Sequence, residues 1–333
     1  MSFQSGIAPW IAAQTTRLLA QRGHAWLLYG PSGLGQYSLA MELVSAWLCE
    51  RPTPQGACGN CVSCHAIEVR SHADLCVLMP ETTLSALAWP LGEKAQSELD
   101  DKKRKPSKEI RVDAMREAVE FSQRTSSLGR GKAVLVFPAE RMNNVSANAL
   151  LKTLEEPAGD VKFVLASEAA HLLLPTIRSR CLGHAMAWPA PDAASRWLAS
   201  QGVETAAVPA LLRATGGRPD NALLLARSGR DAEVWARLPK ALQRGDALLQ
   251  DWAIPDVLDT LHKLCHDLQV VQQGAAARFF LAADLPTPAS HAVLSQWGRD
   301  LSQAMKTMEH PFNPGLMQEA LLSQAKTVLN SGH

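Results

Sequence analysis

The stretch GPSGLGQYS at residues 30–38 restricts more than any other feature how this chain can fold. An apolar run at 25–29 precedes it, and a segment of helical character follows it. In this order, Gly30, Gly33 and Gly35 allow the backbone amides at the start of a helix to surround an anion. The order is typical of a nucleotide phosphate loop, whose full pattern is G-x-x-x-x-G-K-[ST]. It predicts a domain built on a parallel α/β sheet.

The loop lacks the side chains that phosphate chemistry needs. Gln36 stands where the pattern has lysine, and Tyr37 stands where it has the hydroxyl that holds magnesium. The apolar run 134–137 is followed by Pro138 instead of the acidic pair that would help to hold the metal, and Glu140 is displaced by two places. Both departures remove charge from the metal site. We therefore expect this chain to bind no ATP, and the loop to serve as a structural turn or a weak anion site.

Further apolar runs at 133–137 and 161–166 have the character of strands buried on both faces. Strands that alternate with helices predict a parallel α/β domain over residues 1–185. The polar tract 92–109 contains KKRK, which could contact phosphate, but we interpret the tract as a solvated insertion loop and assign it no role.

The composition and the pattern of the sequence change after residue 188. Alanine- and leucine-rich segments of helical character follow, with glycine breaks between them and no further strand pattern. They predict a small helical lid domain over 186–228 and an all-helical domain over 229–333, with a last helix near 316–329.

Four cysteines lie within sixteen residues, as C-x8-C-x2-C-x2-C at Cys49, Cys58, Cys61 and Cys64. Thiolates at this spacing can converge on one tetrahedral zinc ion at ~2.3 Å, which closes the site and favours a structural role. The alternative is four buried or idle thiols, and neighbouring His65 is the competing ligand. We predict a structural zinc module over residues 49–64. The three remaining cysteines are expected to be small core residues: Cys76, Cys181 and Cys265.

Composition narrows the class of protein. The chain of 333 residues is 47% hydrophobic and 20% charged, which suits a globular protein with packed cores. Its formal charge of +1 gives no overall positive field for nucleic acid. No apolar stretch is long enough for a membrane span, the first residues lack the pattern of a secretory signal, and clustered cysteines in odd number argue against a disulfide framework. We expect a cytoplasmic protein with no membrane partner.

Two arginines, Arg178 and Arg180, follow the third strand run. They could be surface charge, or they could form a phosphate-directed pair that is offered to a neighbouring subunit. An arginine that reaches a γ-phosphate from a neighbour stabilises the charge of the transition state. The residues alone leave both interpretations open.

Several stretches together resemble bacterial clamp-loader subunits of the AAA+ class. They are NALLKTLEEP at residues 148–157, the triplet Ser179-Arg180-Cys181, and the four-cysteine insertion after the phosphate loop. Chain length and the order of motifs agree, so the resemblance covers essentially the whole chain. It is closest to the members of that family that have a defective phosphate loop.

The resemblance implies a P-loop NTPase-like (AAA+) domain with a zinc-binding insertion, a lid and a helical collar. It implies a subunit that hydrolyses no ATP itself, in a hetero-pentameric ring with gamma or tau ATPase subunits and a delta subunit. The ring would load the sliding clamp of DNA polymerase III onto primed DNA. Arg180, within its serine-arginine-cysteine triplet, would be an arginine finger that enters the ATP site of an adjacent gamma or tau subunit.

Two alternatives remain open at this point. The first is an active ATPase of the gamma or tau type, which Gln36 and the segment after residue 137 oppose. The second is a zinc-knuckle protein that binds nucleic acid. It requires a basic, aromatic-rich face near the cysteines, where Trp47 and Arg51 are nearly all that the sequence offers.

Overall fold

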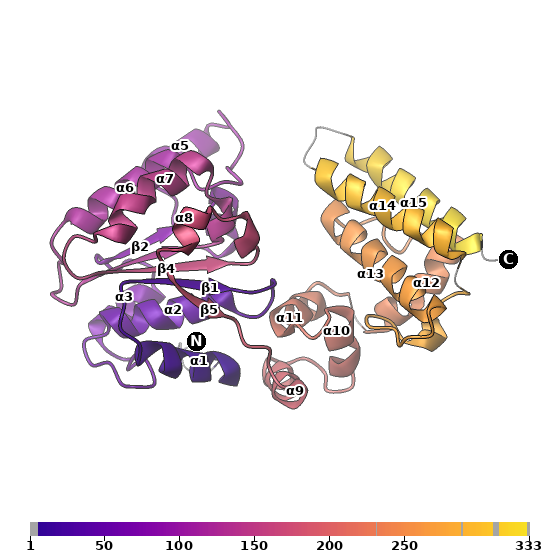
Figure 1. Cartoon of the computed structure of the whole chain (residues 1–333), viewed down its shortest axis with the longest axis horizontal. Coiled ribbons are helices and arrows are strands. Elements are labelled where there is room, and N and C mark those ends of the chain that lie inside the picture. The colour runs from indigo at the N-terminus through magenta and orange to yellow at the C-terminus, as the bar shows by residue number, and fades with distance from the viewer. Residues whose placement is uncertain (1–5, 231, 288, 309–312, 332–333) are drawn as a thin grey trace. The chain divides into compact units, whose positions relative to one another are not determined.

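The computed structural model describes residues 6–230, 232–287, 289–308 and 313–331. The chain divides into two compact units, Met1–Ala193 and Ala194–His333. Most elements of each unit are labelled in Figure 1. Our division of the chain into three domains, with boundaries at 185 and 228, stays a prediction.

The first unit is built on a five-stranded parallel sheet, as the sequence pattern predicts. The strand order is β2-β3-β4-β1-β5, and in its centre Leu27 pairs with Leu165 on one side and Gly183 on the other. The strands are β1 (Ala25–Tyr29), β2 (Leu75–Leu78), β3 (Lys132–Val136), β4 (Val161–Ser167) and β5 (Leu182–Ala185). The three central strands β1, β3 and β4 are those that the apolar runs predict. The two edge strands, β2 and β5, were not predicted.

Helices cover both faces of this sheet, so its central strands are buried on each side (Figure 1). One face carries α1 (Pro9–Leu19), α2 (Gln36–Leu48) and α3 (Val62–Glu68). The other carries α6 (Val112–Gln123), α7 (Asn144–Glu155) and the single-turn α8 (Pro175–Arg178). The core on that second face packs Met115 of α6 and Leu150 of α7 against Phe163 of β4.

Our interpretation of the polar tract 92–109 as a solvated loop was correct about solvation, since most of its described residues are exposed, but wrong about the conformation. The tract contains the helix α5 (Glu93–Asp100), and α4 (Glu81–Ala86) precedes it. The Arg104 guanidinium donates to Glu81 at 2.7 Å and to Glu98 at 2.7 Å, and the backbone N–H of Ser107 donates to Glu81 at 2.8 Å. Because Glu81 is buried, these bonds hold the tract against the domain. The main partner of the tract, Glu81, lies outside it, so the sequence pattern within the tract could not reveal this packing.

A buried carboxylate ties the start of β3 to the loop before it. Asp74 accepts hydrogen bonds from the Ser126 hydroxyl at 2.9 Å and from the backbone N–H groups of Ser127 and Leu128 at 2.8 and 2.9 Å. The Lys132 ammonium lies 3.1 Å away and is buried as well. Burial alone would raise the pKa of Asp74, but these donors lower it to about 2.

We expect Asp74→Asn to reduce the free energy of unfolding by about 3 kcal/mol at pH 7, because it leaves the buried Lys132 without its charged partner. In the wild type the folded pKa lies below the unfolded value, so the stabilisation is present above about pH 4 and is lost as the pH falls toward 2. Urea unfolding measured from pH 7 to pH 2 should show this loss in the wild type and not in the variant. Asp160→Asn, at an exposed ion pair with Lys162, is the control and should change stability little. Equal pH profiles for wild type and Asp74→Asn would contradict the assignment.

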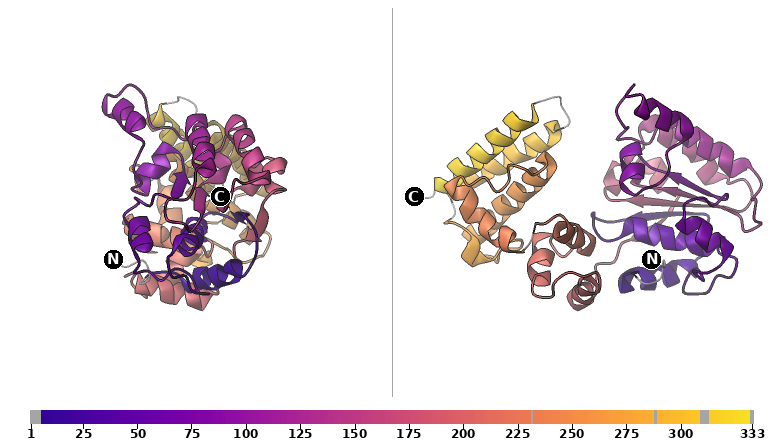
Figure 2. Two further views of the ribbon diagram at one scale, coloured as in Figure 1. Left: turned by 90° about the vertical axis from the view of Figure 1, so that its left-hand side faces the viewer. Right: turned by 180° about the vertical axis from the view of Figure 1, so that it is seen from behind.

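The described part of the chain after residue 188 forms helices and no strand, as expected. Figure 2 shows α13, α14 and α15 packed side by side. Their core holds Trp297, and the buried carboxylate of Asp267 accepts from the backbone N–H groups of residues 278–280 at 2.7–2.9 Å. The helices are α9 (Pro191–Ser200), α10 (Val208–Ala214), α11 (Pro219–Arg227), α12 (Ala232–Arg244), α13 (Ile254–Gln272), α14 (His291–Thr307) and α15 (Pro314–Asn330). None of the helices formed by the described residues combines the length and apolar character that crossing a bilayer requires.

Candidate functional site

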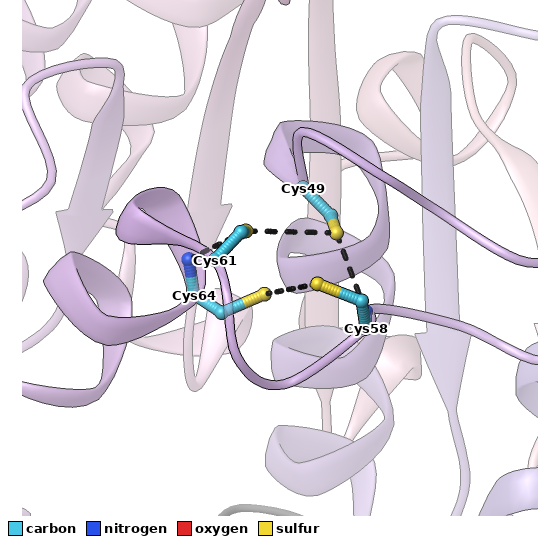
Figure 3. Close-up of side chains that lie close together, drawn as sticks. All are labelled: Cys49, Cys58, Cys61 and Cys64. Carbon is cyan, nitrogen blue, oxygen red and sulfur yellow. Dashed lines mark hydrogen bonds between the residues drawn. The ribbon is translucent and has the colours of Figure 1, made fainter.

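The four clustered cysteines come together as the sequence spacing predicts (Figure 3). Their sulfur atoms all lie within 4.8 Å of one another, with Cys49 and Cys61 at 3.8 Å and Cys58 and Cys64 at 4.0 Å. A tetrahedral zinc site with bonds of ~2.3 Å has sulfur–sulfur edges of about 3.8 Å. The four thiols therefore have the dimensions of a zinc site.

Local structure explains why these sulfurs converge. Cys49 lies directly after the end of α2, and Cys61 directly precedes α3, which contains Cys64. Backbone N–H groups point at the sulfurs: those of Arg51 and Cys58 donate to Cys49 at 3.3 Å, and that of Cys64 donates to Cys61 at 3.4 Å. Hydrogen bonds of this kind stabilise thiolates, which are the form that binds a metal.

The neighbourhood gives the thiols different acidities. The backbone N–H of Asn60 lowers the pKa of Cys58 to about 6, whereas burial raises the pKa values of Cys49 and Cys64. His65, which the sequence left as a competing ligand, is 74% exposed and faces Glu68 at 4.0 Å instead of joining the cluster. The cluster therefore offers a metal four sulfur ligands.

The other three cysteines lie outside the cluster. Cys265 is buried in the helical core and donates to the carbonyl of Leu294 at 3.4 Å. Cys76 and Cys181 are partly buried against the core of the sheet, and burial raises the pKa of each to about 12. These positions agree with our expectation of small core residues.

The phosphate loop follows β1 and ends at the start of α2. Gly33 and Gly35 have φ angles of 82° and 89°, which L side chains rarely adopt, and a Cβ on Gly30 would meet Met186 at 3.0 Å. Gln36 is only 2% exposed, and its amide nitrogen donates to the carbonyls of Gly30 and Pro31 at 2.8 Å each. The side chain at the position of the missing lysine therefore closes the loop on itself.

Aromatic side chains surround the next position. The Tyr37 hydroxyl accepts from the indole N–H of Trp89 at 2.8 Å, and the Tyr37 ring lies 5.4 Å from Phe137, which directly follows β3. Arg70 lies 5.1 Å from the centre of the Trp89 ring, and burial raises the pKa of Tyr37. The space between the loop and the end of β3 thus holds an aromatic cluster. Sequence reasoning missed Trp89, which lies 52 residues from Tyr37.

The displaced acid after β3 also has internal partners. The Glu140 carboxylate accepts from the Ser167 hydroxyl at 2.8 Å and from the backbone N–H of Glu168 at 3.2 Å. Both partners lie at the end of β4, so Glu140 links the ends of two neighbouring strands.

The predicted arginine finger lies between α8 and β5. The Nε atom of Arg180 donates to the Glu155 carboxylate at 2.5 Å, a second guanidinium nitrogen donates to the same oxygen, and Nη1 donates to the carbonyl of Thr176 at 2.8 Å. The Arg180 side chain is 30% exposed. Arg178 and Ser179 line a hollow of about 810 Å³ that Gly30 also borders. Glu155 is a partner that sequence reasoning missed, although it lies within the stretch 148–157.

The sequence of the chain is similar to those of DNA polymerase III subunits. A family model described as DNA polymerase III, delta subunit, matches residues 14–187. A protein of Pseudomonas aeruginosa named DNA polymerase III subunit delta' is 37% identical over 283 residues, which cover 78% of this chain and 79% of the relative. The Escherichia coli protein of the same name is 33% identical over 223 residues, or 65% of this chain and 60% of the relative. The tau subunit of Escherichia coli is 33% identical over 159 residues, which cover 48% of this chain and 21% of the relative.

Proposed function

The chain belongs to the DNA polymerase III delta-subunit family, and we propose that it works as the delta-prime-type subunit of a clamp loader. In this proposal it binds and hydrolyses no ATP and lends Arg180 to the ATP site of a neighbouring gamma or tau subunit. A delta subunit completes the hetero-pentameric ring, which loads the sliding clamp onto primed DNA. The alternative of an active gamma- or tau-type ATPase has less support, because the tau match covers less than half of the chain.

The proposal rests chiefly on the Gln36 side chain, which points back into its own loop and bonds to the carbonyls of Gly30 and Pro31. Phosphate transfer needs a lysine to neutralise the β- and γ-phosphates and a hydroxyl to hold magnesium. Here the neutral Gln36 amide donates hydrogen bonds to carbonyls of the loop, and the Tyr37 hydroxyl accepts one from Trp89. A loop in this state retains its glycine turn as a scaffold and lacks the charge that recognises a nucleotide.

We expect titration of the isolated chain with ATP and magnesium to show no saturable binding at ATP concentrations up to about 1 mM. A Kd of that size corresponds to only about 4 kcal/mol of binding free energy. Gln36→Lys should not restore binding, because the cluster of Tyr37, Trp89 and Phe137 remains beside the loop. An active gamma or tau subunit, titrated in the same buffer, is the positive control. Micromolar binding and turnover by the wild-type chain would reverse the proposal in favour of an ATPase.

We also propose that the cysteine cluster holds a structural Zn²⁺ ion with Cys49, Cys58, Cys61 and Cys64 as ligands. Sulfur separations of 3.8 and 4.0 Å and three backbone N–H···S bonds support it. When bound, the ion cross-links the end of α2 to the start of α3. Four protein ligands fill a tetrahedral site, so the role is structural.

A further inference from the structure

Glu155, the partner of Arg180, lies at the end of a well-anchored helix. Glu155 is the last residue of α7, and its neighbour Leu154 is buried in the core beneath the sheet. The carbonyl of Leu154 accepts from the His24 ring at 2.8 Å, which fixes this end of the helix further. Arg180 follows α8, which is anchored by the fully buried Ile177. The two charged side chains therefore meet from two anchored segments.

The end of a helix adds its own attraction for a cation. The last carbonyls of α7 carry the partial negative charge of the helix C-terminus, which favours a nearby guanidinium. Three nitrogens of Arg180 are engaged, two by Glu155 and one by the carbonyl of Thr176. A guanidinium has five N–H donors, so two are left for a phosphate.

We propose that Glu155 is a positioning residue that holds Arg180 in one orientation before the phosphate of a neighbouring subunit arrives. This inference rests on the proposed function, in which Arg180 acts on the ATP of a gamma or tau subunit. A free arginine side chain samples many rotamers, and restricting them in advance lowers the entropic cost of reaching the transition state.

The exposure of the pair determines how large the effect is. Glu155 is 47% exposed and Arg180 30% exposed, and ion pairs in such surroundings are weak because water screens them. Glu155 can bias the orientation of the guanidinium without withholding its charge from a phosphate. We therefore expect loss of the Glu155 charge to slow the reaction about 3–10-fold, far less than the 10³–10⁵-fold that an arginine finger contributes.

The test is a double-mutant cycle in the ring reconstituted with gamma or tau, delta, clamp and primed DNA. Glu155→Gln should lower kcat of the ATP site that this chain borders about 3–10-fold and leave KM for ATP unchanged, because the pair acts on the transition state. In the Arg180→Ala background the same substitution should have no further effect. Glu155→Asp, which keeps the charge, should recover part of the rate.

The matched control is Glu156→Gln at the exposed neighbouring carboxylate, which should behave as wild type. If Arg180→Ala itself leaves hydrolysis unchanged, the proposed function fails and the role of Glu155 falls with it. If Arg180→Ala slows hydrolysis but Glu155→Gln matches or exceeds the wild-type rate, only the positioning role is overturned. An equal loss from Glu155→Gln in both backgrounds would show a merely structural contribution and would also overturn it.

Discussion

Zinc removal should unfold the module at residues 49–64 and lower the thermal transition of the first unit by at least about 10 °C. Structural zinc contributes on the order of 10 kcal/mol of binding free energy, which is folding free energy where the unfolded chain holds no site. A change of 1 kcal/mol shifts the transition of a domain of this size by about 2–4 °C, so even a fraction of that energy gives the expected shift. Protein purified without chelator should contain one zinc ion per chain.

Substitution should reproduce the effect of a chelator. Cys61→Ser removes a sulfur that both approaches Cys49 at 3.8 Å and accepts from the Cys64 N–H, so we expect zinc content near zero and faster amide hydrogen exchange at Arg51, Cys58 and Cys64. Cys265→Ala alters a cysteine in the other unit and should leave the zinc content unchanged. Wild-type protein that contains no zinc, or whose thermal transition is unchanged by a chelator, would overturn the proposed zinc site.

The module was predictable because its constraints are local. Cys58, Cys61 and Cys64 follow one another at x2 spacing, and Cys49, at the end of α2, lies only nine residues before Cys58, so one short segment supplies all four sulfurs. The central strands were predictable for a related reason. Every residue of β3 is buried, and strands covered on both faces read as continuous apolar runs.

The edge strand β5 could not be predicted from an apolar run. Its sequence, LGHA, has no apolar run, and the ring of its buried His184 is hydrogen-bonded to Gln14 at 2.9 Å and to Arg17 at 3.2 Å, both from the distant helix α1.

The phosphate loop could also be predicted only in part. The sequence shows that lysine is missing, but only the fold shows that Gln36 turns back to the loop carbonyls and that Trp89 bonds to Tyr37. His184 and Tyr37 depend on contacts between distant segments, whereas the bonds of Gln36 are local and depend on the conformation of the loop.

Replacing Arg180 by alanine should slow the ATP site that this chain borders by about 10³-fold or more, because an arginine that reaches the transferred phosphate contributes 10³–10⁵ in rate. The reconstituted ring would lose the part of its turnover that this site supplies. The chain itself should fold and assemble normally, since the ion pair of Arg180 with Glu155 is partly exposed and such pairs contribute little to stability. The measurement is single-turnover ATP hydrolysis by the ring in the presence of clamp and primed DNA.

Arg178→Ala is the matched control and settles which of the two arginines reaches the phosphate. Arg178 ends α8 and borders the hollow beside Gly30, whereas Arg180 is held by Glu155 and Thr176. If the orientation of the guanidinium decides the role, Arg178→Ala should leave the rate within about 3-fold of wild type, as expected for a charge that only borders the site. Arg180→Lys should fail almost as completely as Arg180→Ala, since an ammonium cannot offer a phosphate the forked pair of donors that a guanidinium provides. Full activity of Arg180→Lys would show that charge alone suffices at this position, and a large loss in Arg178→Ala alone would move the finger to the neighbouring arginine.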